Sequence, residues 1–390
     1  MFRLILFIII IAIGVLTYKA KGKKGRVALI VLDVFLGLIL IASIALPAIL
    51  FTDYQGRPTT GPYEVKQCQA ILIDSARQDI FENDGSSREV PVYFYYPEGV
   101  TEEDSLPLVI FSHGAFGYYQ SNTSTYMELA SNGYVVVSLD HPHHSFYTHD
   151  TSGKTVIVDR EFIQTAMYLQ GNDDTDAQET YDITSAWMEL REEDMNFVID
   201  TIKAAAASGE LDDAWFTEET AREDVLDTVS LIDSTKIGLM GHSLGGATAV
   251  TVGRREDVSA AIDLDGTMIG EETGVIDGVY QIDERPYTTP LLAIDSESHH
   301  NSRVEARGEG YVYANNVILD NATTGYSTYI EGAEHMNFTD LPLFSPMLAQ
   351  NLGIGNVDAG ECIDQVNALV LSFFDCYLKG EGTFTVNDSY

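Results

Sequence analysis

The stretch KIGLMGHSLGGATAV, residues 236–250, places a serine between glycines where an apolar run ends. KIGLM has the composition of a buried strand, and a helical pattern begins directly after the glycines. G-x-S-x-G alone occurs by chance, but between a strand and a helix it is typical of a nucleophile elbow, a sharp turn that exposes the serine hydroxyl. We therefore expect Ser243 to be a nucleophile; the alternative is a glycine-rich connector with no catalytic role.

A serine nucleophile needs a general base, and in this strand–turn–helix arrangement the chain order is Ser, acid, His. The histidines after Ser243 are His299, His300 and His335. His335 follows the apolar run 326–332 in a loop, where an imidazole can reach the elbow, and it is the expected base. His299 and His300 directly follow an earlier strand and are expected at the pocket edge or on the surface.

The acid that would orient this imidazole has two candidates at strand ends. Asp265 follows the run SAAIDL, and Asp295 follows PLLAI. Either carboxylate could accept the Nδ1–H of His335 and stabilise the imidazolium that forms during acyl transfer. Asp263 shares a strand face with Asp265, so alternation along the strand does not exclude it. Position in the sequence leaves the choice of acid open.

Two backbone N–H groups would stabilise the oxyanion that forms when Ser243 attacks a carbonyl carbon. Leu244, the residue after the nucleophile, supplies one of them at the start of a helix. The second is expected at Ala115, in the loop that ends the early strand of PLVIFSHGAFG (107–117). His113 in the same loop is expected to be structural, because it precedes the serine in the chain.

Short apolar runs alternate with longer amphipathic ones after residue 65. The expected strands are 65–73, 90–97, 107–113, 134–140, 236–242, 258–265, 290–296 and 326–332. Helical patterns cover 125–133, an apolar stripe over 183–202, and 362–380. The alternation predicts an α/β fold with a mostly parallel central sheet and helices on both faces. The turn-like NDGSS (83–87) predicts an antiparallel hairpin between the first two strands.

The expected catalytic domain spans residues 65–390 and follows a Gly/Pro/Thr-containing linker at 52–64. Residues 145–185 are its least regular part and are expected to form an insertion or lid. The histidines of DHPHHSF (140–146) have no zinc-site spacing, so this stretch is expected to line the pocket mouth. We expect no metal ion and no other cofactor.

Two apolar runs precede the linker, at residues 4–18 and 27–51, and a basic stretch separates them. About 20 helical residues cross the ~30 Å hydrocarbon core of a bilayer, so the second run is long enough and the first is near the lower limit. We expect a two-helix transmembrane hairpin; a cleaved signal peptide is the competing interpretation of the first run. A cytoplasmic basic loop would place the catalytic domain outside the cell, anchored in the cell membrane.

The chain carries a net charge of −37, although its first 51 residues are basic. So acidic a surface repels nucleic acid, and no nucleic-acid partner is expected. The three cysteines Cys68, Cys362 and Cys376 include no CxxC pattern, which argues against a zinc or redox motif. Free thiols and a single bond from Cys68 both stay open.

Five blocks of this chain together resemble, in order and spacing, the plasma-type platelet-activating-factor acetylhydrolase family of the α/β-hydrolase superfamily. They are FSHGAFG (111–117), ELASNGYVVVSLDHPHHS (128–145), KIGLMGHSLGGATAV (236–250), AAIDLDGTM (260–268) and GAEHMNFTDL (332–341). The resemblance covers about residues 65–380, and DLDGTM and GAEHMNF are more discriminating than the GHSxGG block that many lipases share.

The resemblance implies an α/β-hydrolase fold and places the acid at Asp265, with Ser243, His335, Ala115 and Leu244 in the roles given above. The expected function is therefore a serine hydrolase that acts on carboxylic esters, with short-chain acyl phospholipids or other lipids as the implied substrates. A general carboxylesterase or a polyester hydrolase of the same fold is the enzymatic alternative. A catalytically inactive surface-binding module on a hydrolase scaffold is the non-enzymatic one.

Overall fold

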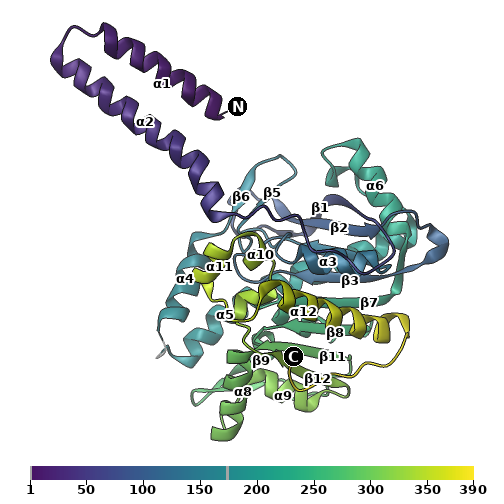
Figure 1. Ribbon diagram of the computed structural model, residues 1–390. Helices are drawn as coiled ribbons and strands as arrows, with labels where there is room; N and C mark the ends of the chain where they lie inside the picture. The colour runs from purple at the N-terminus through teal and green to yellow at the C-terminus, as the bar shows by residue number, and fades with distance from the viewer. Residues whose placement is uncertain (1, 173–174) are drawn as a thin grey trace. The chain divides into compact units, whose positions relative to one another are not determined.

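A computed structural model describes residues 2–172 and 175–390 (Figure 1). The chain forms two compact units. The smaller combines residues 1–55 with Leu341–Leu352, and the larger combines Gly56–Asp340 with Gly353–Tyr390. The larger unit contains every residue expected in catalysis.

An eight-stranded sheet in the order β1-β2-β4-β3-β7-β8-β11-β12 forms the centre of the larger unit. Its strands are β1 (Val65–Gln78), β2 (Ser87–Pro97), β3 (Leu106–Ser112), β4 (Val135–Leu139), β7 (Ile232–His242), β8 (Ala260–Leu264), β11 (Leu291–Ser296) and β12 (Gly325–Ile330). All neighbours from β4 to β12 are parallel. The mostly parallel sheet predicted from the sequence is therefore confirmed.

The edge of the sheet is antiparallel. β1 pairs with β2 so that Leu72 lies opposite Val90, and β2 in turn runs antiparallel to β4. This is the hairpin that the NDGSS turn predicts. The inner strands differ from this edge in their burial. β3, β4, β8 and β11 are buried along their whole length, as expected where helices cover both faces of a parallel sheet.

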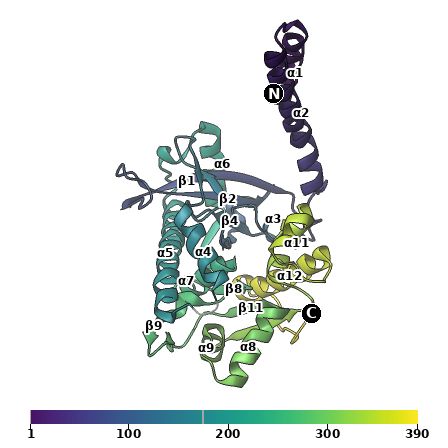
Figure 2. The ribbon, with the colours of Figure 1, turned by 90° about the vertical axis from the view of Figure 1, so that its left-hand side faces the viewer.

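Helices cover both faces of this sheet. They are α3 (Thr123–Ser131), α5 (Ala177–Ser208), α6 (Glu219–Ser230), α7 (Leu244–Val252), α8 (Glu297–Glu309), α9 (Ala314–Asn321) and α12 (Ala359–Phe374). Figure 2 shows α5 and α7 on one side of the sheet and α3 and α12 on the other. Neighbouring strand residues alternate between the two layers: Val109 packs with Tyr126 of α3, whereas Ile110 packs with Val198 of α5.

Helix α5 is the longest helix of the larger unit, and its ends explain its extent. The Asp176 carboxylate accepts hydrogen bonds from the backbone N–H groups of Gln178 and Glu179, which stabilises the first turn. Gly209 ends the helix in the left-handed conformation that glycine adopts without steric cost. The helix carries Arg191 and Asp194 at positions that are completely buried.

Several shorter elements were not predicted. They are the hairpin of β5 (Tyr147–His149) and β6 (Thr155–Ile157), the hairpin of β9 (Glu272–Ile276) and β10 (Val279–Ile282), helix α4 (Arg160–Gly171), and the turns η1 (Glu102–Asp104), η2 (Asp213–Trp215), η3 (Ile269–Glu271) and η4 (His335–Phe338). The helical segment η5 (Asp375–Lys379) continues α12 and lies within the predicted helix 362–380. The stretch 145–185 thus contains a hairpin, α4 and the start of α5, although residues 173 and 174 of the predicted lid lie outside the described residues. Its role as a lid stays a prediction.

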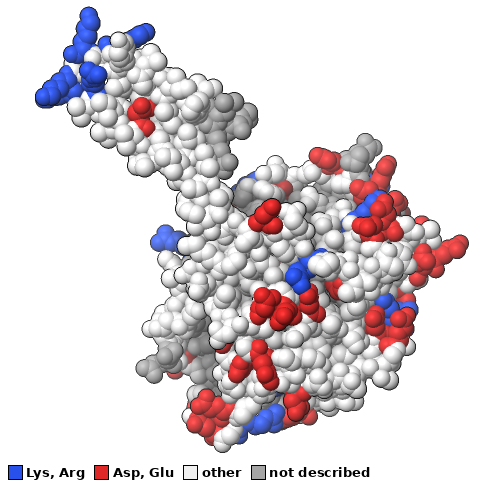
Figure 3. All heavy atoms as spheres, viewed as in Figure 1, with Lys and Arg blue, Asp and Glu red and all other residues white. Residues whose placement is uncertain are grey.

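The smaller unit contains α1 (Phe2–Lys19), α2 (Lys23–Leu50), α10 (Leu341–Phe344) and α11 (Pro346–Leu352). Helices α1 and α2 lie side by side, and basic side chains gather at the turn between them (Figure 3). Of the described helices, α2 is long and apolar enough to cross a membrane, judged by length and composition, whereas the apolar helix of residues 5–19 is shorter. The predicted helices are present; their membrane topology stays a prediction.

Acidic side chains predominate on the face of the larger unit in Figure 3, in line with the strongly negative charge of the sequence. Cys68, Cys362 and Cys376 are all free thiols. Burial raises the pKa of the Cys68 and Cys362 thiols to about 12, so both are protonated at neutral pH. Of the two states left open by the sequence, the structure has free thiols.

Candidate active site

Ser243 occupies the turn between β7 and α7. Its φ of 56° and ψ of −126° lie in a region that costs a residue with a side chain about 1–3 kcal/mol. The surrounding backbone holds the turn, because the Ser243 N–H donates to the Leu264 carbonyl at 2.9 Å and its own carbonyl accepts from the Ala247 N–H at 3.1 Å. Such a strained turn has the geometry of a nucleophile elbow.

Two glycines of the G-x-S-x-G stretch allow this turn to pack closely. A Cβ atom on Gly245 would lie 2.0 Å from the carbonyl oxygen of Ser112, at the end of β3. A Cβ atom on Gly241 would lie 2.2 Å from the carbonyl oxygen of Gly245. No real side chain tolerates these separations, so the glycines let the start of α7 approach the end of β3 and place Ser243 above the sheet.

Asp265 and His335 meet beside the elbow. Asp265 follows β8 with a φ of 53°, and His335 begins the turn η4 after β12. The His335 Nδ1–H donates to Oδ2 of Asp265 at 2.7 Å, and the Ser296 N–H donates to Oδ1 at 2.6 Å. Burial acts to raise the pKa of Asp265, but hydrogen bonds from His299 and His335 outweigh it and lower the pKa below the ordinary value. The carboxylate is therefore ionised at neutral pH.

The other two candidate acids have different partners. Asp295 forms a buried ion pair with Arg303 of α8. Asp263 accepts the Gly266 N–H at 2.9 Å, and burial together with the neighbouring Asp295 raises its pKa well above the ordinary value. Asp263 thus accepts a backbone hydrogen bond within the turn after β8. Among the described residues, Asp265 is the carboxylate that contacts His335.

His299 makes contacts with two carboxylates that the sequence did not predict. It lies at the edge of the cleft, as expected, but its Nδ1 is also 3.3 Å from Oδ1 of Asp265 and 3.5 Å from Oδ1 of Asp295. Burial acts to lower its pKa, but the hydrogen bond to Asp265 and the charge of Asp295 outweigh it and raise the pKa. His300, by contrast, stacks on Tyr329 with ring centroids 4.1 Å apart.

Potential metal ligands of Asp265, Asp295 and His299 lie within 4.8 Å of one another. The Arg303 guanidinium already contacts Asp295, and His335 donates to Asp265. A divalent cation would have to compete with both groups. The donor set thus fits a hydrogen-bonded carboxylate cluster better than a cation site.

Ser243, Asp265 and His335 line one cleft of about 500 Å³. The cleft lies at the carboxyl ends of the parallel strands β7, β8 and β11, the usual position of a ligand site in such a sheet. Besides His299, its other lining residues are apolar or carry hydroxyl groups: Ala115, Trp187, Leu244, Thr267, Ile269, Ser296, Ser298 and Ser302.

Ala115 and Leu244, the predicted oxyanion donors, both line this cleft. Leu244 is the first residue of α7, so its N–H lies at the positive end of the helix dipole. Throughout residues 2–172 and 175–390, no protein acceptor is found for the N–H of Ala115 or of Leu244. Both amides are thus available to an oxygen bound beside Ser243.

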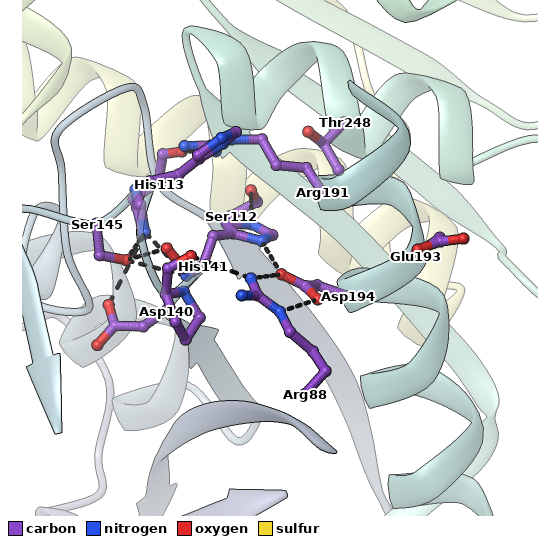
Figure 4. Close-up of polar contacts among 12 residues, drawn as sticks. Arg88, Ser112, His113, Asp140, His141, Ser145, Arg191, Glu193, Asp194 and Thr248 are labelled. Carbon is purple, nitrogen blue, oxygen red and sulfur yellow. Dashed lines mark hydrogen bonds and ion pairs between the residues drawn. The ribbon is translucent and has the colours of Figure 1, made fainter. Parts of the chain in front are cut away.

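A second Ser/His/Asp arrangement lies beneath the loop that carries Ala115 (Figure 4). Nδ1 of His141 is 3.0 Å from Oδ2 of Asp194, and its Nε2 is 2.9 Å from Oγ of Ser112. All three residues are completely buried, so no substrate reaches the hydroxyl. Burial, followed by the charge of Arg191, also lowers the pKa of His141 to about 4. These residues form a structural network.

The expectation for DHPHHSF (140–146) was wrong in part. His141 and His144 are buried beneath the loop of Ala115, and neither lines the cleft beside Ser243. His113, expected to be structural, is buried as well: its Nδ1 is 2.6 Å from the Gly114 carbonyl oxygen and its Nε2 is 2.7 Å from Oγ of Ser145.

Comparison with known proteins is consistent with this geometry. A ferulic acid esterase from Streptomyces cinnamoneus shares the fold, with a TM-score of 0.58 at 20% sequence identity over 84% of this chain and 93% of its own. The platelet-activating factor acetylhydrolases of Cavia porcellus and Bos taurus are each 23% identical, over 72% and 73% of this chain. This chain spans only 59% and 60% of the length of these two relatives.

The sequence model of the family "Platelet-activating factor acetylhydrolase, isoform II" matches residues 76–389. This range includes the elbow, the Asp265–His335 pair and both candidate oxyanion donors, and it excludes α1 and α2. The chain therefore belongs to the family of platelet-activating factor acetylhydrolase, isoform II, and its larger unit has the α/β-hydrolase fold.

Proposed function

We propose that the chain is a serine hydrolase that cleaves carboxylic esters through an acyl-enzyme intermediate. The observation that carries the proposal is the meeting of three groups at one cleft: a serine on a strained turn, a histidine, and an ionised carboxylate 2.7 Å from that histidine. These are the nucleophile, base and orienting acid of acyl transfer. Membership of an acetylhydrolase family and the fold shared with an esterase give further support.

In this mechanism Oγ of Ser243 attacks the acyl carbonyl while Nε2 of His335 takes its proton. Asp265 holds the imidazole by Nδ1–H and stabilises the imidazolium. The Ala115 and Leu244 N–H groups donate to the oxyanion. His335 then gives its proton to the leaving alcohol, and a water molecule activated by the same imidazole releases the acid. No step requires a cofactor.

The proposed substrates are esters with short acyl chains, including acyl phospholipids and other lipids. Trp187 and Ile269 provide apolar walls beside Ser243, whereas Ser298 and Ser302 provide hydroxyl groups. A cleft of about 500 Å³ matches a small ligand better than a long extended chain. The acidic surface repels anionic lipid surfaces and nucleic acid, so we expect neither to bind to it.

We also propose that α1 and α2 form a transmembrane hairpin that anchors the catalytic domain, residues 65–390, on the outer face of the cell membrane. Helix α2 is long and apolar enough to cross a membrane, and the basic side chains lie at the turn between the helices. Protease added to intact cells should then digest the catalytic domain. Protection of that domain in intact cells would reverse the proposed orientation, and an N-terminus beginning after α1 would show cleavage.

Labelling with a fluorophosphonate probe tests the enzymatic proposal. The wild-type chain and Asp295→Asn should label, whereas Ser243→Ala should not and Asp265→Asn should label much more slowly. A panel of p-nitrophenyl esters of increasing acyl length, beside short-chain phospholipids, then separates an acetylhydrolase from a general carboxylesterase or polyester hydrolase. Failure of the folded wild-type chain to label would instead favour an inactive binding module.

A further inference from the structure

The loop that carries Ala115 is held from behind by a buried arginine. Arg191 extends from α5 toward the loop (Figure 4). Its Nη1 donates to the His113 carbonyl oxygen at 2.6 Å, its Nη2 lies 3.4 Å from the Gly114 carbonyl oxygen, and its Nε lies 3.4 Å from Nδ1 of His144. Two consecutive carbonyl groups of the loop thus face one guanidinium.

Burial of a charged side chain at the position of Arg191 costs free energy of folding. Arg191 is completely buried, and within the described ranges its hydrogen-bond partners are two backbone carbonyls and a neutral imidazole, with no carboxylate in direct contact. Burial lowers its pKa to about 9, so it remains charged at neutral pH. A buried charge without a direct counter-ion opposes stability.

The peptide group between Gly114 and Ala115 links Arg191 to the cleft. Its carbonyl oxygen accepts from the His113 Nδ1–H at 2.6 Å and faces Arg191, and its N–H is that of Ala115. The N–H and C=O of a trans peptide point in opposite directions, and all described peptide bonds are trans. Holding the carbonyl therefore fixes the direction of the Ala115 N–H on the other side of the peptide, and Ala115 lines the cleft of Ser243. Hydrogen bonds to the carbonyl also polarise the peptide and strengthen its N–H as a donor.

The rest of the loop adds to this restraint. The Phe116 N–H donates to the His144 carbonyl at 3.2 Å, and the Gly117 N–H donates to the Gly114 carbonyl at 3.1 Å. A Cβ atom on Gly114 would lie 2.9 Å from Nδ1 of His242, so the peptide also fits closely against the elbow. The loop has little freedom to turn this N–H away from the cleft.

We propose that Arg191 and His113 are positioning residues of the oxyanion hole, which hold the Gly114 carbonyl from behind so that the Ala115 N–H faces the reacting carbonyl. The proposal rests on the ester hydrolase function proposed above. Arg191 acts through the Gly114–Ala115 peptide and does not touch substrate. Loss of this restraint should weaken the transition state and leave ground-state binding of the ester nearly unchanged.

Arg88 offers a matched control for Arg191. It is also a buried arginine of the same network, but it donates to Asp194 at 2.8 Å and to the Pro142 carbonyl at 3.1 Å, and it makes no hydrogen bond to residues 113–115. Arg191→Lys and Arg88→Lys keep the positive charge and replace the guanidinium by the ammonium group of a shorter side chain. Melting curves and titration of the active sites with the fluorophosphonate would measure the folded fraction of each variant. The kcat values can then be given per folded molecule.

Arg191→Lys should lower kcat about 10²-fold with KM within twofold, as expected for loss of one oxyanion donor. Its affinity for a trifluoromethyl ketone, which forms a tetrahedral adduct with the serine, should fall by a similar factor. Arg88→Lys should lower the melting temperature and keep kcat and ketone affinity per folded molecule. Equal kinetic losses in the two variants, or an Arg191→Lys enzyme with wild-type kcat, would refute the proposal.

A second pair of variants tests the same peptide if Arg191→Lys does not fold. The side-chain amide of His113→Asn can take the place of Nδ1–H on the Gly114 carbonyl, whereas His113→Leu removes that donor. His113→Asn should keep most of the ketone affinity and His113→Leu should lose it. Equal affinities would contradict the proposal. Inactivity of the wild-type chain would contradict the hydrolase function itself, so the two failures are distinguishable.

Discussion

Nδ1 of His299 lies 3.3 Å from Oδ1 of Asp265, the carboxylate oxygen that His335 does not contact. The acid of the candidate triad therefore faces two imidazoles, one from the loop after β12 and one from the first turn of α8. Each donates to a different oxygen, so the carboxylate is fixed in its plane. Substitutions of Asp265, of Asp295 and of His299 should therefore affect activity and stability to different extents.

Asp265→Asn and Asp295→Asn should have opposite consequences. Asp265→Asn removes the acceptor of the His335 Nδ1–H, and we expect kcat per folded molecule to fall about 10⁴-fold. Asp295→Asn leaves the buried Arg303 without its counter-ion, and we expect a loss of about 3–5 kcal/mol in unfolding free energy. Activity per folded molecule should then stay within a few-fold of wild type. Ester hydrolysis and urea denaturation measure the two effects, and the reverse pattern would make Asp295 the acid.

The contribution of His299 to stability should depend on pH. Its pKa is raised in the folded chain, so its protonation stabilises the fold below the ordinary value of 6.5, and this stabilisation is lost as pH rises through the folded-state pKa. The difference in unfolding free energy between wild type and His299→Gln should therefore be larger at pH 5.5 than at pH 8.5. His300→Gln is measured beside it, because it removes the adjacent imidazole, which stacks on Tyr329. A difference that grows with pH would contradict the assignment.

Ser243→Gly should separate catalysis from folding at the elbow. Glycine adopts the φ of 56° without the steric cost that serine meets there, so we expect unfolding free energy to rise by about 1–3 kcal/mol. Ser243→Ala keeps a side chain on the strained backbone and should gain less. Both variants should lose ester hydrolysis. Thermal unfolding of the three chains measures the difference, and equal stabilities would show that the turn is not strained.

Gly245→Ala should disrupt the elbow, because its Cβ atom would lie 2.0 Å from the Ser112 carbonyl oxygen. We expect a destabilisation of at least about 3 kcal/mol, with loss of activity, since neither backbone can move without shifting β3 or α7. Gly308→Ala in α8 is the matched control: nothing lies within 4 Å of its Cβ position, and alanine there should stabilise the helix by about 1 kcal/mol. Melting temperatures that change equally would contradict this account.

The pattern of the sequence was sufficient for the central sheet. All eight of its strands were predicted, because buried parallel strands form continuous apolar runs that are separated by helical patterns and turn residues. The hairpins β5/β6 and β9/β10 were missed, since their strands are short and partly exposed and lack apolar alternation. Helix α4 was missed for a related reason: only Phe162 of its side chains is buried.

Chain order and local pattern predicted Ser243 and His335, and the resemblance to a known family selected Asp265. Ser243 lies between a strand and a helix, and His335 was selected by its place after the last strand. The choice between Asp265 and Asp295 depends on which loop folds over which strand end, and alternation within a strand contains no such information. The contact of His299 with Asp265 and the burial of Arg191 against residues 113–114 are likewise products of tertiary packing.

Trp187 and Arg191 lie one turn apart on α5, so a single rigid helix contributes both a wall of the cleft and the support behind the Ala115 loop. A substitution that displaces α5 to admit a bulkier ester would move both together. Selection for a new substrate on this helix would then lower turnover at the same time. Changes of acyl preference should therefore accumulate on α8, at Ser298 and Ser302, which line the cleft from another element.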